Sequence, residues 1–214
     1  MNPAVKILGT SAGIGVAIIL GFIIYGELTR PVGFEFNEGT WIVGNGLSKG
    51  LMLKYDIEKP EKSMLVRLDF KDKVDGNWLV MITINDDQDN AKEVILSDTL
   101  VGVDIPEDFE EWKDIKDTLL WIVNYVFEPK PLVANSVWST IQYKLQTVEF
   151  KLVAKEDISI ASGNFNAFKL AYYLGYQGGG EFWIVKDMPL PIKAEVKDQD
   201  GMLEFRYELV DYSL

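Results

Sequence analysis

The sequence contains no histidine and no cysteine among its 214 residues. Without cysteine, the chain can form no disulfide, offers no thiolate nucleophile and cannot carry a lipid on a cysteine side chain. Without histidine, it lacks the imidazole base and the usual nitrogen ligands of zinc, copper and haem. Only carboxylate and carbonyl oxygens remain for calcium or magnesium. These absences predict a protein without a metal or cofactor, without catalytic residues and therefore not an enzyme.

Basic residues are also scarce, with 21 Lys and Arg against 33 Asp and Glu. The net charge is −12 and the sequence pI is about 4.5. Such a surface repels the phosphates of nucleic acids, so we exclude nucleic acid as a partner. It also disfavours a domain that lies flat on anionic lipid headgroups. No Asn-x-Ser/Thr sequence occurs, so the chain offers no N-glycosylation site.

Charge is missing altogether between Ile7 and Tyr25. An α-helix of that length covers roughly 28 Å, close to the thickness of a bilayer's hydrocarbon core. We therefore predict a transmembrane anchor in residues 1–30 and a single folded domain in residues 31–214. A cleaved signal peptide is the alternative, but its apolar region usually spans 7–15 residues and ends at small residues. Here Ile24-Tyr25-Gly26 has a small residue only at its last position, which favours a retained anchor.

The flanks of this segment indicate its orientation. The short leader carries Lys6 and the terminal amine without an acid, whereas Arg30 lies among Glu27, Glu35 and Glu38. Because lysine and arginine are retained on the cytoplasmic side and acids count little, we predict a cytoplasmic N-terminus. The expected location is the cell membrane, with a single span and the domain outside the cytoplasm.

Small residues recur every four positions within the predicted span, at Gly9, Gly13, Ala17 and Gly21. This spacing places them on one helix face, where a second helix can approach closely. The partner could be a second copy of this chain, giving a homodimer, or another membrane protein. Chance is the alternative, since glycine is common in membrane helices.

The domain begins with alternating apolar and polar residues. The alternation covers Leu51–Ile57, Met64–Phe70 and Trp78–Ile84, and Asp75-Gly76 between the last two is typical of a hairpin turn. A further strand is expected at Glu93–Leu96. One apolar face for each strand predicts an antiparallel sheet with one face in water.

Strands return after Trp138. Alternation covers Val148–Leu152, Ile192–Val196 and Leu203–Leu209, and Asp200-Gly201 predicts a hairpin between the last two. We also expect Gly178-Gly179-Gly180 to form the turn of a hairpin that joins Phe168–Tyr176 to Glu181–Lys186.

The period changes to that of a helix between these two groups of strands. Asp104 and Pro106 begin it, and Glu128-Pro129 follows its end at Phe127. An apolar stripe runs along it, formed by Phe109, Trp112, Ile115, Leu119, Ile122, Val123 and Val126. The segment from Leu119 to Phe127 is apolar on nearly all sides, which predicts deep burial against the sheet rather than a second membrane span.

Three segments in the C-terminal part carry a resemblance to a known family. They are Ile158–Lys169 with its Gly163-Asn164-Phe165 turn, Glu181-Phe182-Trp183-Ile184, and Leu190-Pro191-Ile192-Lys193. From Glu149 to Tyr212 the chain resembles an uncharacterised family of bacterial periplasmic domains, similar in fold to the LolA/LolB lipoprotein carriers. The resemblance implies a long, curved antiparallel sheet with a helix in its concave face. The strands–helix–strands order predicts the same fold class independently: mainly β (α+β), a half-barrel with one helix on its concave face. Unlike the carriers, this chain has no lipobox cysteine, which speaks against shuttling between membranes.

Three motif matches are better explained without chemistry. Gly46-Leu47-Ser48-Lys49-Gly50 fits the G-x-S-x-G pattern of hydrolases, but the chain has no histidine base and a strand follows. Asn85, Asp87 and Asp89 have the spacing of a calcium loop, but the glycine and the glutamate that the loop requires are Asn90 and Leu96. Acids at 107–111 are explained by their position at the start of a helix.

The chain has many aromatic residues: six Trp, nine Tyr and eleven Phe. They could form an ordinary core or line an apolar groove between the helix and the sheet. The residues expected to line such a groove are Trp78, Phe109, Trp112, Leu119, Val123, Phe150 and Trp183. We therefore predict a noncatalytic, membrane-anchored domain that binds an apolar or lipid-like ligand. The alternative is an accessory or assembly subunit of a membrane complex that docks through the small-residue face of its transmembrane helix.

Overall fold

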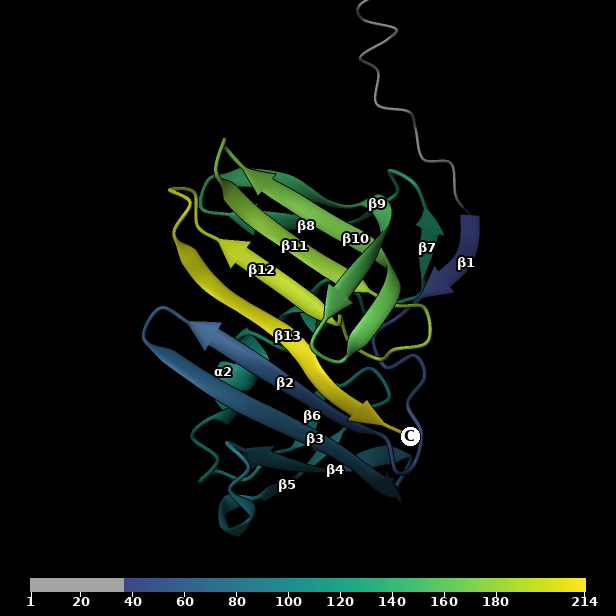
Figure 1. Ribbon diagram of the computed structural model, residues 1–214, viewed down its shortest axis with the longest axis vertical. Helices are drawn as coiled ribbons and strands as arrows, with labels where there is room; N and C mark the ends of the chain where they lie inside the picture. The colour runs from purple at the N-terminus through teal and green to yellow at the C-terminus, as the bar shows by residue number, and fades with distance from the viewer. Residues whose placement is uncertain (1–36) are drawn as a thin grey trace, which may run out of the picture. The chain divides into compact units, whose positions relative to one another are not determined.

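A long, open antiparallel sheet dominates the computed structural model, which describes residues 37–214 (Figure 1). Thirteen strands form an 11-stranded sheet, in the order β6-β5-β4-β3-β2-β13-β12-β11-β10-β9-β8, and a two-stranded sheet, β1-β7. The strands of the N-terminal half are β1 (Asn37–Trp41), β2 (Met52–Lys59), β3 (Lys62–Val74), β4 (Asn77–Ile84), β5 (Lys92–Leu96) and β6 (Gly102–Asp104). The others are β7 (Lys130–Val133), β8 (Val137–Tyr143), β9 (Gln146–Ile160), β10 (Gly163–Leu174), β11 (Gly178–Ile184), β12 (Lys193–Lys197) and β13 (Leu203–Ser213).

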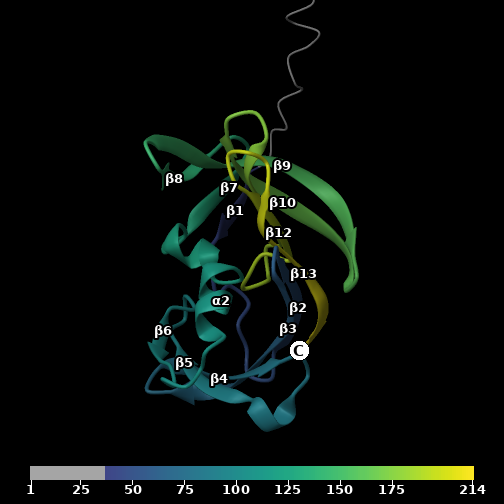
Figure 2. The same cartoon turned by 90° about the vertical axis from the view of Figure 1, so that its left-hand side faces the viewer.

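The sheet curves around a short helical segment, as Figure 2 shows. This segment consists of α2 (Trp112–Asp117) and a 3₁₀ helix at Trp121–Asn124. The mainly β class, the antiparallel pairing and the helical segment on the concave side agree with the prediction from sequence. Short 3₁₀ helix also occurs at Gln88–Asn90, between β4 and β5.

Alternation along the strands produces the core. Every second residue of β2 is buried, at Leu53, Tyr55 and Ile57. Asp75 and Gly76 connect β3 to β4 with φ values of 50° and 81°, a tight turn that agrees with the expected hairpin. The hairpin β12–β13 is present as well. Glu35–Leu214 form one compact unit, and the buried core lies within it, so this part of the chain has what an independently folding domain needs.

The predicted long helix is wrong in its extent. Only Trp112–Asp117 is α-helical, and the expected start of the helix at Asp104 belongs to strand β6. Thr118 ends the helix with φ −118° and ψ −83°, and its hydroxyl donates to the carbonyl oxygen of Asp114 at 2.6 Å. This side-chain bond competes with the backbone bond that would continue the helix. The residues after Thr118 are apolar on nearly all sides. They can therefore be buried in several orientations, and a regular helix is not required for their burial.

The glycine run is also not the hairpin turn that we expected. The turn lies at 175–177, and Gly178-Gly179-Gly180 begin strand β11. A Cβ on Gly178 would lie 2.1 Å from the carbonyl oxygen of Asp198, and one on Gly180 would lie 2.3 Å from Cε1 of Tyr172. The glycines therefore allow close packing within the sheet instead of forming a turn.

Three short strands were not predicted from the sequence. Strands β1 and β7 pair with each other beside the large sheet, and β6 forms one of its edges. The small sheet is held to the rest by Trp41, whose ring stacks on Trp138 with centroids 6.0 Å apart. The Trp41 indole nitrogen also donates to the carbonyl oxygen of Met188 at 3.0 Å.

Candidate functional site

Five aromatic rings fill the concave face where β9, β10 and β11 lie beside the 3₁₀ helix. Trp121 stacks on Phe182 at 4.8 Å and on Tyr172 at 5.7 Å between ring centroids. Tyr125 lies 4.3 Å from Trp121, and Phe150 meets Trp121 edge to face at 6.0 Å. Burial raises the pKa of the Tyr172 phenol, which therefore stays neutral. In this part of the space between helix and sheet, the aromatic rings pack against one another.

Several of the predicted groove residues belong to this core. Trp78, Phe109, Leu119 and Phe150 are at most 7% exposed. Trp78 packs edge to face on Phe70, with centroids 6.0 Å apart. The structure thus buries these four residues, and they line none of the hollows described below.

Trp183 lies on the opposite face of the sheet from the one we expected. Its neighbour Phe182 faces the core, and the alternation of β11 therefore directs Trp183 outward, where it is half-buried. The ammonium groups of Lys169 and Lys193 lie 5.0 and 5.5 Å from the ring centroid. The indole nitrogen donates to Glu156 at 2.6 Å. Trp183 is therefore held by charged neighbours on the convex face and is not part of the concave interior.

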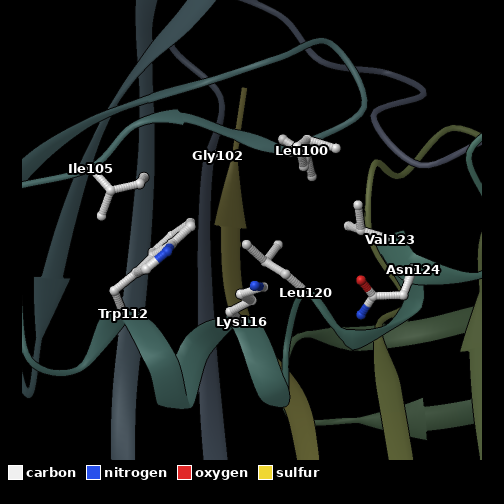
Figure 3. A pocket seen from close by; sticks show the side chains of 9 residues that line it. Leu100, Gly102, Ile105, Trp112, Lys116, Leu120, Val123 and Asn124 are labelled. Carbon is white, nitrogen blue, oxygen red and sulfur yellow. The ribbon is translucent and has the colours of Figure 1, made fainter.

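A cavity of about 310 Å³ lies on the other side of the helical segment, against the chain between β5 and β6 and the residues that follow β6 (Figure 3). Of the predicted residues, Trp112 and Val123 line it. The other lining residues are Leu100, Val101, Gly102, Ile105, Lys116, Leu120 and Asn124. Seven of these nine residues are apolar or glycine, and the cavity reaches solvent, since Val101 is 50% exposed and Lys116 is exposed. The apolar cavity is thus real but displaced from the position predicted for it.

One face of the helical segment supplies much of this lining. Trp112, Lys116, Leu120 and Asn124 are spaced by four residues and point into the same space, although the α-helix itself ends at Asp117. Leu119, one residue away from Leu120, is fully buried on the core side. The segment therefore contacts both the core and the cavity, and Leu120 belongs to both.

Ion pairs fix the helical segment to the neighbouring hairpin. Asp114 accepts hydrogen bonds from Lys59 at 2.6 Å and Lys62 at 2.9 Å. These bonds hold the pKa of the Asp114 carboxyl below its usual range. Since both lysines lie at the β2–β3 turn, the pair connects α2 to the end of that hairpin.

The sequence did not indicate the lining residues at 100–105, because they come from a connection without periodicity. Leu100 is 1% exposed with φ 61°, an unusual backbone conformation for leucine, and Ile105 follows the three-residue strand β6. The spacing of residues 112, 116, 120 and 124 was visible in the sequence and could have indicated a second helix face.

Two other hollows, of about 350 and 250 Å³, are more polar than the cavity. The larger is lined by charged residues that already pair with each other, including Arg206 with Glu58 at 2.5 Å and Lys193 with Glu208 at 3.8 Å. Because these charges are satisfied within the protein, this hollow is a weaker candidate for a ligand site.

The segments that match the hydrolase and calcium-loop patterns lie in turns and connections between strands. Gly46–Gly50 belongs to the turns between β1 and β2, and Lys49 pairs with Asp72 there. Asp87 accepts a hydrogen bond from the backbone of Asp89 at 3.1 Å in the connection between β4 and β5. Within residues 37–214, no group of three acidic residues is placed to hold a metal ion.

The predicted anchor and its small-residue face, Gly9, Gly13, Ala17 and Gly21, lie outside the described residues. In the part that the structure describes, no helix has both the length and the apolar character needed to cross a membrane.

Comparisons with known proteins give distant structural likenesses. No protein-family model matches the sequence. No curated protein matches it either. A protein from Bacteroides fragilis, described as exported and of YmcC-like fold, is 10% identical over 82% of this chain and 100% of its own, with a TM-score of 0.47. A protein from Parabacteroides distasonis, described as a lipoprotein, is 12% identical over 81% of this chain and 99% of its own, with a TM-score of 0.42.

MucB is also similar, at 14% identity over 80% of this chain, with a TM-score of 0.47. The match spans about half of MucB, 55% of its length. MucB of Pseudomonas aeruginosa has been solved in a complex with MucA. At these identities and TM-scores the likeness identifies no family for this chain.

Proposed function

We propose that this chain is a noncatalytic, extracytoplasmic binding domain that holds an apolar or lipid-like ligand in the cavity beside α2. The observation that carries the proposal is the cavity itself, about 310 Å³ in volume and lined mostly by apolar side chains. Small-molecule sites are concave, predominantly apolar and provided with a few polar groups, and their volumes begin at about 300 Å³. Leu100, Ile105, Trp112, Leu120 and Val123 form the apolar wall, and Lys116 and Asn124 are the polar groups.

The proposed location outside the cytoplasm rests on the uncharged segment Ile7–Tyr25 and on the scarcity of positive charge after it. Protease added to intact cells should remove the domain if this orientation is right. If the domain is protected in intact cells and cleaved only after lysis, the proposed orientation is wrong.

Ligand binding is tested with a fragment of residues 35–214, purified without detergent and checked for cooperative unfolding. Organic extraction and mass spectrometry should find a co-purified apolar molecule. Val123→Trp, which places an indole in the cavity, should remove that molecule. Val103→Trp is the matched control, because Val103 is 56% exposed on β6 and does not line the cavity.

The alternative proposal is an accessory or assembly subunit of a membrane complex, docking through Gly9, Gly13, Ala17 and Gly21. The absence of any co-purified molecule from the fragment, together with a stable membrane partner of the full chain, would favour this role over ligand binding.

A further inference from the structure

We infer that the cavity takes a single-chain fatty acid whose carboxylate meets the ammonium group of Lys116 at the mouth. This inference rests on the proposed function, since it names the chemical class of the ligand for the same cavity. It depends on two properties of the cavity: its volume and the positive charge of Lys116 in its lining.

The volume selects one acyl chain. At about 310 Å³ the cavity lies at the small end of the range found for small-molecule sites. A diacyl lipid needs space for two chains and a headgroup, which exceeds this volume. The apolar wall is formed by branched side chains and the Trp112 ring, and along it only Lys116 and Asn124 offer a polar side chain. A ligand that fits must therefore be apolar along most of its length and polar at one end.

The charge selects an anion. Among the residues that the structure describes, Lys116 is the only charged one that lines the cavity, in a chain whose net charge is −12. The nearest acids along the helix do not neutralise it: Asp114 is bonded to Lys59 and Lys62, and Asp117 does not line the cavity. Among residues 37–214, Lys116 forms no ion pair, whereas most of the other lysines do.

The position of Lys116 suits the end of an acyl chain. Figure 3 shows it between Trp112 and Asn124, with Leu120 beside it and Leu100 across the cavity. Lys116 is exposed, so a carboxylate bound there stays at the solvent boundary while the chain lies against the apolar wall. A carboxylate and the Lys116 ammonium group can form a charge-assisted hydrogen bond at this boundary, and water reduces its contribution because Lys116 is exposed.

The test compares lauric acid with dodecanol and dodecylamine, which share one chain and differ in the charge of the head. Binding to the fragment 35–214 is measured by isothermal titration calorimetry below the concentrations at which these compounds form micelles. We expect laurate to bind severalfold, up to about fivefold, more tightly than dodecanol, as an ion pair at an exposed lysine predicts, and dodecylamine to bind most weakly. Lys116→Gln should remove the preference for laurate and leave dodecanol binding unchanged.

Lys113→Gln is the matched control, because Lys113 is exposed on the same helix, forms no ion pair within the described residues and does not line the cavity. It should alter neither affinity. Equal binding of laurate and dodecanol, or a laurate preference that survives Lys116→Gln, would overturn the fatty-acid assignment and leave the apolar site intact. Failure of all three compounds to bind would instead refute the proposed ligand-binding function together with this assignment.

Discussion

Trp121 and Trp183 provide a direct test of which tryptophan belongs to the core, since the sequence pattern predicted both at the interior or its rim and the structure places only Trp121 among the concave aromatic rings. We expect Trp121→Ala to lower the free energy of unfolding by about 3 kcal/mol. The estimate takes the low end of the 3–5 kcal/mol found for truncating large aromatic side chains, because Trp121 is half-buried. It includes the loss of contacts to Phe182, Tyr172 and Tyr125, each worth about 0.5–1.5 kcal/mol.

Trp183→Ala should cost less, about 2 kcal/mol. It removes two cation–π contacts, from Lys169 and Lys193, each worth about 0.5–1 kcal/mol at an exposed site. It also removes one hydrogen bond to Glu156, but it leaves no cavity inside the protein. Urea unfolding of both variants, followed by far-ultraviolet circular dichroism, measures the two losses on the same scale. If Trp183→Ala destabilises the domain as much as Trp121→Ala, the assignment of faces along β11 is wrong.

Three further variants test other parts of the fold. Leu119→Asp should lower the free energy of unfolding by several kcal/mol, because it buries an unpaired charge at a fully buried position; thermal melting within a degree or two of the parent would contradict this. Asp114→Asn should cost about 1 kcal/mol in urea unfolding at pH 7 through its bonds to Lys59 and Lys62. Folding lowers the pKa of Asp114, so the difference in unfolding free energy between the parent and this variant should be full above the unfolded pKa of about 3.9 and should vanish as pH falls through the folded pKa. A difference in unfolding free energy that is unchanged at low pH would refute the ionic explanation. Tyr207→Phe should leave stability unchanged or raise it by about 1 kcal/mol, since its buried hydroxyl has no partner among the described protein groups; a clear loss on thermal unfolding would show that it has one.

Strand alternation was sufficient to predict most of the sheet from the sequence. The buried residues of β2 and β3 occupy every second position, as at Tyr55 and Val66, because the core covers only one face of the sheet. What alternation does not contain is the pairing of distant strands. Strand β13 pairs with β2, placing Leu209 opposite Tyr55, and no local pattern specifies that partnership.

The helical region shows why the position of the site could not be predicted. A stripe from Phe109 to Val126 fits a helix, but it does not reveal that Thr118 would end the helix early. The opposite wall of the cavity comes from Leu100 and Ile105, in a connection whose conformation depends on contacts rather than on periodicity. The sequence therefore predicted an apolar cavity beside this segment and two of the residues that line it, Trp112 and Val123, but it placed the cavity on the other side of the segment.

The all-round apolar character of this segment accounts for both the core and the cavity. Leu119 and Ile122 are fully buried on the core side, so the core removes the apolar side chains of that half of the segment from water. Leu120 and Val123 line the cavity toward the chain near β6, where Leu120 is buried but Val123 is only half-buried. When an apolar ligand covers apolar surface that the protein leaves exposed, the complex is stabilised by roughly 25 cal/mol for each Å² removed from water. Since Lys116 lies on that same face, the ligand that gains most is one whose apolar chain ends in a negative charge.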